Sequence, residues 1–69
     1  FEAVMMGLRL KEGMNIQLFE ERFHTSVVEV YRTQINKLLN EGKLILEKNS
    51  LRCSEKGFEI LNSILLEFM

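Results

Sequence analysis

Most of this chain repeats its apolar residues at helical spacing, and one short stretch does not. Apolar residues recur every three or four positions before residue 42 and after residue 54, whereas residues 44–53 alternate. The alternating apolar residues are Leu44, Leu46, Leu51 and Cys53. Helical spacing gathers side chains on one face of a helix, and alternation gathers them on one face of a strand. An isolated hairpin is unstable in water and must pack on the helices. The sequence therefore predicts a mostly α fold with one small β-hairpin.

Two helices are expected before residue 24. Residues 1–10 form the first, and Gly13 provides an exit in which glycine freely adopts a positive φ. Asn15 is a preferred N-cap residue and begins a short second helix, whose pattern is broken at His24 and Thr25. The expected inward residues of these helices are Phe1, Val4, Met5, Leu8, Ile16, Phe19 and Phe23.

A third, longer helix is expected up to Glu41. Either Thr25 or Ser26 caps its start, and Gly42 occupies the C′ position that favours glycine. The expected inward residues of this helix are Val28, Tyr31, Ile35, Leu38 and Leu39.

The alternating stretch predicts a hairpin, followed by a last helix. Asn49-Ser50 forms the two-residue turn, and Leu51–Cys53 is the returning strand. Ser54 then caps the last helix. The expected inward residues of that helix are Phe58, Leu61, Ile64, Leu65 and Phe68. The order helix-helix-helix-strand-strand-helix predicts a winged-helix-like single domain over residues 1–69.

Length and composition exclude several classes of protein. The 69 residues allow one domain, and 46% hydrophobic residues are enough for one core. The chain begins with Phe1 rather than Met, so we expect a processed product or a piece of a longer chain. No apolar run approaches the ~20 residues that a membrane span needs. One Cys and one His cannot form an internal disulfide or a Cys/His zinc site. The lone cysteine fits a reducing compartment, and we expect a cytoplasmic protein.

The winged-helix order raises DNA binding as one function, with the third helix reading the DNA. The polar groups available on that helix are Arg32, Gln34, Asn36 and Lys37. However, Glu29 and Glu41 lie on the same helix, and the net charge of the chain is −1. DNA-binding proteins usually gather Lys and Arg on one face, because phosphate contacts dominate their affinity. The sequence therefore favours a protein-binding module over a DNA-binding one.

Two side chains carry reactive groups that admit two interpretations each. His24 could ligate a metal or haem, but its neighbours Thr25 and Ser26 favour a polar residue at a helix junction. Cys53 could act as a nucleophile, but that chemistry needs an activating base. Its inward position on a strand favours a small core residue instead.

The methionines and the paired glutamates are weaker candidates. The thioethers that could meet haem iron belong to Met5, Met6, Met14 and Met69. Methionine at helical spacing is more typical of a core. Glu20 and Glu21 are adjacent, so on a helix they point about 100° apart and do not converge. We therefore expect no catalytic, cofactor-binding or metal-binding residue in this chain.

The expected helices carry more apolar residues than their inward faces need. The surplus residues are Met6, Leu10, Ile60, Leu66 and Met69. They either complete the small core, stay exposed as much apolar surface does, or contact a missing partner. Such a partner would be the rest of a longer chain or a second copy.

An ordered set of short motifs runs through the whole chain. The set consists of Met5-Met6-Gly7-Leu8-Arg9-Leu10 with Gly13, then Phe19, Phe23 and Tyr31, Leu38-Leu39-x-x-Gly42-x-Leu44, Leu51-Arg52-Cys53-Ser54-x-x-Gly57, Asn62 and Leu65-Leu66-Glu67-Phe68. In this order the chain resembles the C-terminal domain of the oxygen-independent coproporphyrinogen III oxidase-like radical SAM proteins, the HemN/HemW family. It departs from the family pattern where Gly often stands in place of His24, and where an apolar residue and Thr usually stand in place of Cys53 and Ser54. Ser54 keeps a capping hydroxyl, whereas no family role transfers to His24.

The resemblance implies that the full-length protein holds a [4Fe–4S] cluster and S-adenosylmethionine in an N-terminal barrel-like domain. Family members either decarboxylate coproporphyrinogen III oxidatively or act as haem chaperones. The cluster-binding motif Cys-x-x-x-Cys-x-x-Cys is absent from this sequence. The resemblance therefore implies a non-catalytic accessory domain that packs beside the barrel and helps cover its active-site side or handle porphyrin or haem.

By the same resemblance, Gly7, Leu8 and Arg9 are the expected interdomain contact, with Arg9 bonding to the barrel. The alternative is a free-standing winged-helix module that binds DNA or protein.

Overall fold

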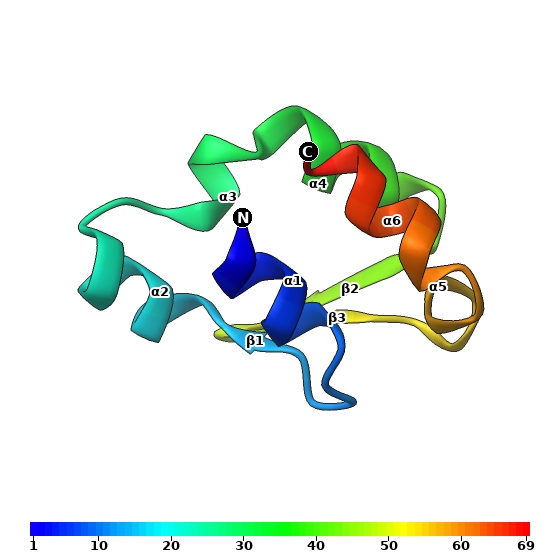
Figure 1. Cartoon of the computed structure of the whole chain (residues 1–69), viewed down its shortest axis with the longest axis horizontal. Helices are drawn as coiled ribbons and strands as arrows, with labels where there is room; N and C mark the ends of the chain where they lie inside the picture. The colour runs from blue at the N-terminus through cyan, green and yellow to red at the C-terminus, as the bar shows by residue number, and fades with distance from the viewer.

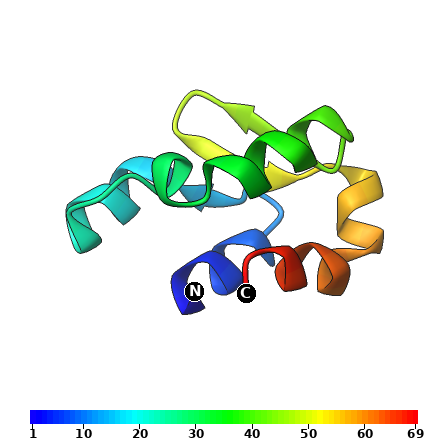
Figure 2. The same ribbon diagram turned by 90° about the horizontal axis from the view of Figure 1, so that it is seen from above.

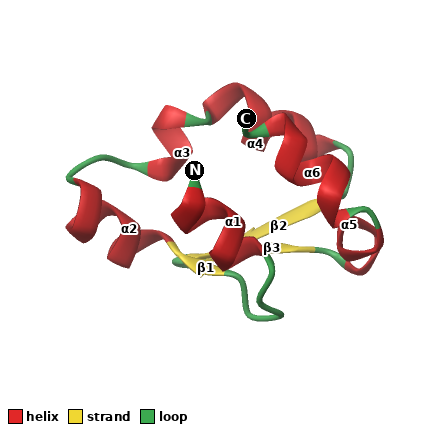
Figure 3. Ribbon diagram, in the orientation of Figure 1, coloured by secondary structure: helices red, strands yellow, loops and turns green.

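The computed structural model describes residues 1–69 and contains six helices and one three-stranded antiparallel sheet (Figure 3). The helices are α1 (Glu2–Leu8), α2 (Ile16–Phe23), α3 (Val27–Val30), α4 (Arg32–Asn40), α5 (Glu55–Glu59) and α6 (Leu61–Glu67), and the strands are β1 (Met14–Asn15), β2 (Leu44–Glu47) and β3 (Ser50–Cys53). The predicted mostly α fold with a hairpin between helices is confirmed. No helix combines the length and the apolar composition that crossing a bilayer would need.

The core lies in the middle of the molecule, and α2 lies outside it. In both views α2 and α3 occupy one end of the molecule and α5 the other (Figures 1 and 2). One cluster of buried apolar residues forms the core, and its members are Val4, Leu8, Met14, Val27, Ile35, Leu38, Leu44, Leu51, Cys53, Ile64, Leu65 and Phe68. Every helix except α2 and α5 supplies at least one of them.

β3 is the central strand of the sheet, with β1 on one side and β2 on the other. The register places Leu44 opposite Cys53. It also places Leu46 opposite Leu51, so the predicted apolar face of the hairpin is confirmed, although Leu46 stays exposed near the turn. The sequence did not predict β1, because two residues are too few to show an alternating pattern.

The predicted turn at Asn49-Ser50 is wrong, and the turn lies one residue earlier, at Lys48-Asn49. Ser50 belongs to β3, where it pairs with Asn15 of β1. Its Oγ also donates to the carbonyl oxygen of Glu12 at 2.7 Å. The contacts of Ser50 with β1 and with the turn before it keep this residue in the sheet. Lys48 takes a positive φ of 51° in the hairpin turn.

Both longer predicted helices are divided by a bend at one residue. The third helix bends at Tyr31 (φ −113°, ψ 33°) and the last at Ile60 (φ −120°, ψ 34°). The Tyr31 ring packs edge-on against Phe68, with ring centroids 5.1 Å apart, so the first bend lies where the two predicted helices meet. The fully buried residue at the start of this region is Val27, one helical turn before Tyr31, whereas the predicted Val28 is half-buried beside it.

Three aromatic residues expected in the core lie on the surface instead. Phe1, Phe23 and Phe58 are all exposed. Phe1 precedes α1, Phe23 is the last residue of α2, and Phe58 lies near the end of the five-residue α5. Each lies at or near the end of a short helix, where no further helical turn covers the apolar face. The other expected inward residues of the helices are buried or half-buried.

The predicted helix caps are confirmed at Asn15 and Ser54. Asn15 Oδ1 accepts from the backbone N–H of Leu18 at 3.0 Å. Ser54 Oγ accepts from the N–H of Gly57 at 3.0 Å. Ser26 is the N-cap residue of α3 but makes no side-chain capping bond. The two bonds hold the starts of α2 and α5, because each satisfies a backbone donor that the helix leaves free.

Candidate functional site

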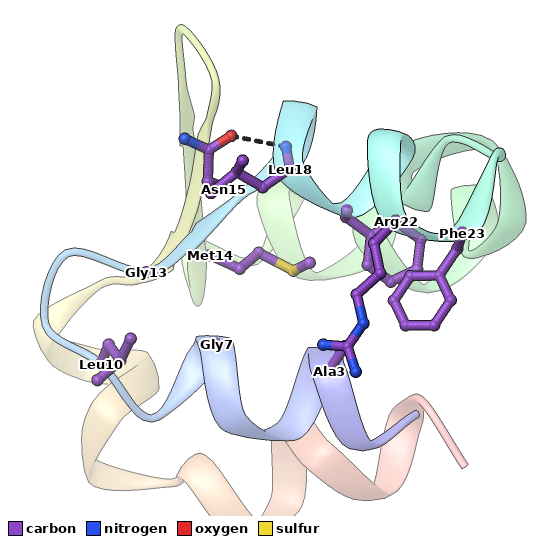
Figure 4. A pocket seen from close by; sticks show the side chains of 10 residues that line it. Ala3, Gly7, Leu10, Gly13, Met14, Asn15, Leu18, Arg22 and Phe23 are labelled. Carbon is purple, nitrogen blue, oxygen red and sulfur yellow. Dashed lines mark hydrogen bonds between the residues drawn. The ribbon is translucent and has the colours of Figure 1, made fainter.

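An apolar groove of about 310 Å³ lies between α1 and α2 (Figure 4). The residues that line this α1–α2 groove are Ala3, Gly7, Leu10, Gly13, Met14, Asn15, Leu18, Phe19, Arg22 and Phe23. They come from α1, from the turn that follows it, and from β1 and α2. The groove therefore joins the segments on either side of the Gly13 turn, which takes a φ of 80°.

The side of the groove formed by α2 is apolar and largely open to solvent. None of the eight residues of α2 is buried. Leu18 is 61% exposed and Phe23 44%, while Phe19 is half-buried and lies 4.6 Å from Phe23 between ring centroids. The Asn15 cap holds the start of this helix. α2 is thus positioned by its cap and by partial packing, and it leaves apolar side chains uncovered.

Gly7 and Met14 form the floor of the groove. Met14 is almost fully buried and its side chain lies between the two helices in Figure 4. A Cβ on Gly7 would overlap the Cβ of Met14. The missing side chain at position 7 therefore lets α1 lie directly on β1.

Arg22 supplies the positive charge of the groove. In Figure 4 its side chain reaches from α2 towards Ala3 of α1. Its guanidinium carbon lies 5.1 Å from the centroid of the Phe23 ring, within the range of a cation–π contact. Arg22 takes part in none of the three ion pairs of the chain. The groove therefore combines an apolar lining with one cation that no carboxylate neutralises.

A second hollow of about 330 Å³ continues the groove towards the first residue of the chain. Its lining residues are Phe1, Glu2, Ala3, Met6, Arg22 and Phe23. Three of these also line the α1–α2 groove, so the two hollows are one continuous surface. Met6 and Leu10 flank it and are 67% and 50% exposed. These two surplus residues therefore do not complete the core, and their side chains are open to solvent or to a partner.

The other surplus apolar residues lie elsewhere. Ile60, Leu66 and Met69 belong to the C-terminal part of the chain, and all three are exposed. None of them lines the groove or its continuation. Of the five surplus apolar residues, only Met6 and Leu10 therefore line a hollow.

His24 lies at a helix junction, as the sequence favours. It is the C-cap residue of α2 in the left-handed conformation (φ 58°, ψ 29°), and its backbone N–H donates to the carbonyl oxygen of Glu20. Its side chain is exposed. Glycine adopts a positive φ most easily. This gives a physical reason for the glycine that often stands in place of His24 in the family pattern.

The core position predicted for Cys53 is confirmed. The residue is 5% exposed, and its Sγ lies 3.7 Å from the carbonyl oxygen of Leu8. Burial raises the pKa of the thiol above its ordinary value. The Cys53 thiol donates a hydrogen bond to a backbone carbonyl oxygen, which is not a base that could activate a nucleophile.

The polar residues proposed for DNA reading lie on α4 and do not form a free basic face. Gln34 is half-buried, and the other three, Arg32, Asn36 and Lys37, are exposed. Lys37 Nζ lies 2.7 Å from Glu67 Oε1, and this hydrogen bond raises the pKa of Lys37. Lys37 is therefore paired at the surface with a carboxylate of α6.

The remaining candidates do not converge. Met14 is buried and Met5 half-buried, whereas Met6 and Met69 are exposed. Glu20 and Glu21 are both exposed on α2. No three His, Cys, Asp or Glu side chains come close enough to hold a metal ion.

The three residues expected to contact another domain are placed very differently. Leu8 is fully buried in the core, and Gly7 is buried against Met14. Arg9 is exposed at the C-cap of α1. Only the Arg9 side chain is therefore free to meet a partner.

The sequence did not single out Leu18 or Arg22. Leu18 lies off the stripe of Ile16, Phe19 and Phe23, and this offset is the one signal that could have indicated a second apolar face on α2. The groove becomes visible only when α1 and α2 are placed side by side.

An apolar hollow with a single charged side chain is typical in composition of surfaces that bind a ligand or a partner. Residues 1–60 match the HemN C-terminal domain family. The chain therefore belongs to the HemN C-terminal domain family, as its motifs predicted.

Named relatives extend the same result. The chain is 32% identical over 68 residues to the heme chaperone HemW of Lactococcus lactis subsp. lactis, covering 99% of this chain and 18% of that protein. It is 34% identical over 71 residues to the mitochondrial radical S-adenosyl methionine domain-containing protein 1 of Mus musculus, covering 99% of this chain and 16% of the relative. The protein of the same name from Danio rerio is 37% identical over 67 residues, covering 93% of this chain and 15% of the relative. This chain thus spans less than a fifth of the length of these relatives. No solved structure matches it significantly.

Proposed function

We propose that this chain is the non-catalytic C-terminal domain of a radical SAM protein of the haem chaperone type, and that it docks on the radical SAM domain of the same protein. The observation that carries the proposal is the match of residues 1–60 to a family of C-terminal domains whose members here are more than five times longer. The open α1–α2 groove supports the docking, because hollowed apolar surfaces commonly mark contacts with other proteins or domains.

In this proposal the cofactors belong to the other domain. A [4Fe–4S] cluster is held by several Cys thiolates. This chain has only Cys53, whose thiol lies in the core. Its own residues therefore do not fit the cluster, and we expect the cluster and S-adenosylmethionine to bind the radical SAM domain.

The name of the Lactococcus relative supports haem handling over the alternative, oxidative decarboxylation of coproporphyrinogen III. The domain would then help cover the active-site side of the barrel or contact porphyrin or haem. A cytoplasmic location is part of the same proposal, and the single buried thiol is consistent with it.

Removing residues 1–69 from the full-length protein tests the accessory role. We expect the remaining protein to keep its iron and its binding of S-adenosylmethionine but to lose haem transfer to an apo-haemoprotein. Iron analysis, equilibrium dialysis and the absorbance of the loaded acceptor measure these three properties. Loss of the cluster on removal would contradict the accessory role. Decarboxylation of coproporphyrinogen III by the full-length protein would favour the alternative activity.

We further propose that the Gly7–Arg9 segment contacts the barrel through Arg9. Arg9 takes part in none of the ion pairs within the chain, so its guanidinium is available to another domain. In the full-length protein, Arg9→Gln should increase proteolytic cleavage between the domains. Lys11→Gln, which removes a nearby exposed charge, is the matched control. Equal cleavage of the two variants would argue against the assignment.

A further inference from the structure

The α1–α2 groove has the properties of a surface that another segment covers. Leu18 is 61% exposed and Phe23 44%, and the hollow between them and α1 is open. An eight-residue helix with no buried residue gains little from the core and is marginal on its own. Covering its apolar side chains would remove them from water, which is favourable. A partner in the groove would therefore stabilise α2.

The position of Phe1 indicates which partner this is. Phe1 lines the continuation of the groove, so a segment that precedes it enters the molecule at the groove itself. In the relatives this domain makes up only 15–18% of the chain, and the family is one of C-terminal domains, so the larger part precedes it. α1 has seven residues and is about 10 Å long, which about three extended residues span.

Arg22 indicates the chemistry of the partner. Its guanidinium stands beside Phe23 and forms no ion pair, although Glu2 also lines the continuation of the groove. A segment that covers the groove removes part of the water around this cation, which is unfavourable unless a carboxylate or carbonyl oxygen replaces it. Arginine and carboxylate form two parallel hydrogen bonds, so an acidic side chain is the best match.

We infer that the stretch of about ten residues preceding Phe1 in the full-length protein turns back and lies in the α1–α2 groove, with apolar side chains against Leu18 and Phe23 and a carboxylate on Arg22. This inference rests on the proposed docking function and specifies its contact surface. In this arrangement the preceding segment stabilises α2. The contact with Arg22 fixes the position of that segment along the groove.

Site-specific photo-crosslinking in the full-length protein tests the inference. A benzophenone amino acid replaces Leu18 in the groove or, as the matched control, Leu66, which is equally open to solvent at 67% exposure on α6. Mass spectrometry then identifies the peptides joined by irradiation. We expect position 18 to react with the peptide that directly precedes residue 1, at least about tenfold more than position 66 does.

The outcomes separate this inference from the proposed function. Crosslinks from position 18 to barrel peptides far from residue 1, or barrel crosslinks from position 66 alone, would retain the docking function and overturn the inference. Crosslinks from position 18 to a second copy, recognised by mixing isotope-labelled and unlabelled chains, would also overturn it. No crosslink from either position to any part of the radical SAM domain would overturn both.

A charge variant tests the role of Arg22. In the full-length protein Arg22→Glu should lower the yield of the crosslink from position 18 about tenfold, because a charge-assisted hydrogen bond is replaced by repulsion. Arg32→Glu changes the same charge on exposed Arg32 of α4 and should leave the yield unchanged. An unchanged yield in Arg22→Glu would overturn the assignment of a carboxylate to this residue.

Discussion

α2 and α6 are helices of similar length and similar apolar content, and they differ in what they contribute to the core. α6 has seven residues and buries Ile64 and Leu65, and Phe68 follows directly after it in the core. α2 has eight residues and buries none. Leu18 in α2 remains 61% exposed. Apolar composition therefore does not decide which helix belongs to the core of this domain.

The difference lies in what each helix packs against. α6 packs with residues of the hairpin and of α4 in a single cluster, and each fully buried side chain contributes about 1.5–3 kcal/mol. α2 is held by the capping bond from Asn15, by a backbone bond from the N–H of Ile16 to the carbonyl oxygen of Asn49 at 2.7 Å, and by the half-buried Ile16 and Phe19. The body of the domain is thus stable through burial, whereas α2 is anchored at its first turn and buries no residue completely. A docking surface drawn from the weakly held part can respond to its partner without unfolding the rest.

Truncating one residue in each helix should give the largest contrast. Ile64→Ala in α6 should lower the free energy of unfolding by about 2–5 kcal/mol, because it leaves a cavity in the core. Leu18→Ala in α2 should change it by less than about 0.5 kcal/mol, because the side chain already faces water. Urea unfolding followed by circular dichroism measures both. Equal losses would show that α2 is part of the core and would remove the contrast.

Adding a methyl group beneath the groove should give the next largest effect. Gly7→Ala should lower the free energy of unfolding by about 1–3 kcal/mol, because its Cβ would overlap that of Met14 and push α1 away from β1. Met6→Ala, at the exposed neighbouring position, is the control and should have almost no effect. An unchanged free energy of unfolding in Gly7→Ala would mean that α1 can move away from β1 at no cost. The floor of the groove would then not be tightly packed.

The features that the sequence predicted correctly are those that depend on neighbouring residues. Asn15 and Ser54 cap helices because their own side chains reach backbone donors three residues on. Gly42 takes a φ of 74° just after α4, at the predicted C′ position. The apolar face of the hairpin follows from alternation alone. Each of these signals is contained within a few residues of sequence.

The features that the sequence missed depend on residues far apart in the chain. The hairpin turn shifts by one residue because Ser50 pairs with Asn15, 35 positions away, through a strand too short to recognise. The bend at Tyr31 lies where its ring meets Phe68. The groove requires α1 and α2 to be placed side by side. The sequence showed Met6 and Leu10 as surplus apolar residues without deciding whether they are exposed, and it carried one weak signal for Leu18 and none for Arg22.

Removing the cap of α2 should give a smaller and more local effect. Asn15→Ala should lower stability by about 1 kcal/mol, because the backbone N–H of Leu18 loses its acceptor. Hydrogen exchange should increase at the amides of α2 and stay unchanged in α6, since the two helices do not share a cap or a buried side chain. A loss of protection that spreads to α6 would show that the two regions unfold together, and the division of the molecule into body and α2 would not hold.

The end of α2 should give the smallest effect, with the opposite sign. His24 holds a positive φ of 58°, which costs a residue with a side chain about 1–2 kcal/mol, whereas glycine adopts it freely. Glycine also loses more chain entropy on folding, which offsets about half of the gain. His24→Gly should therefore raise the free energy of unfolding by about 0.5 kcal/mol, while His24→Ala, which keeps the Cβ, should not. If both variants gained equally, the effect would come from removing the imidazole. If neither variant gained stability, the positive φ at residue 24 would not be costly in the folded protein. Other contacts would then hold the end of α2 more tightly than its exposed side chains indicate.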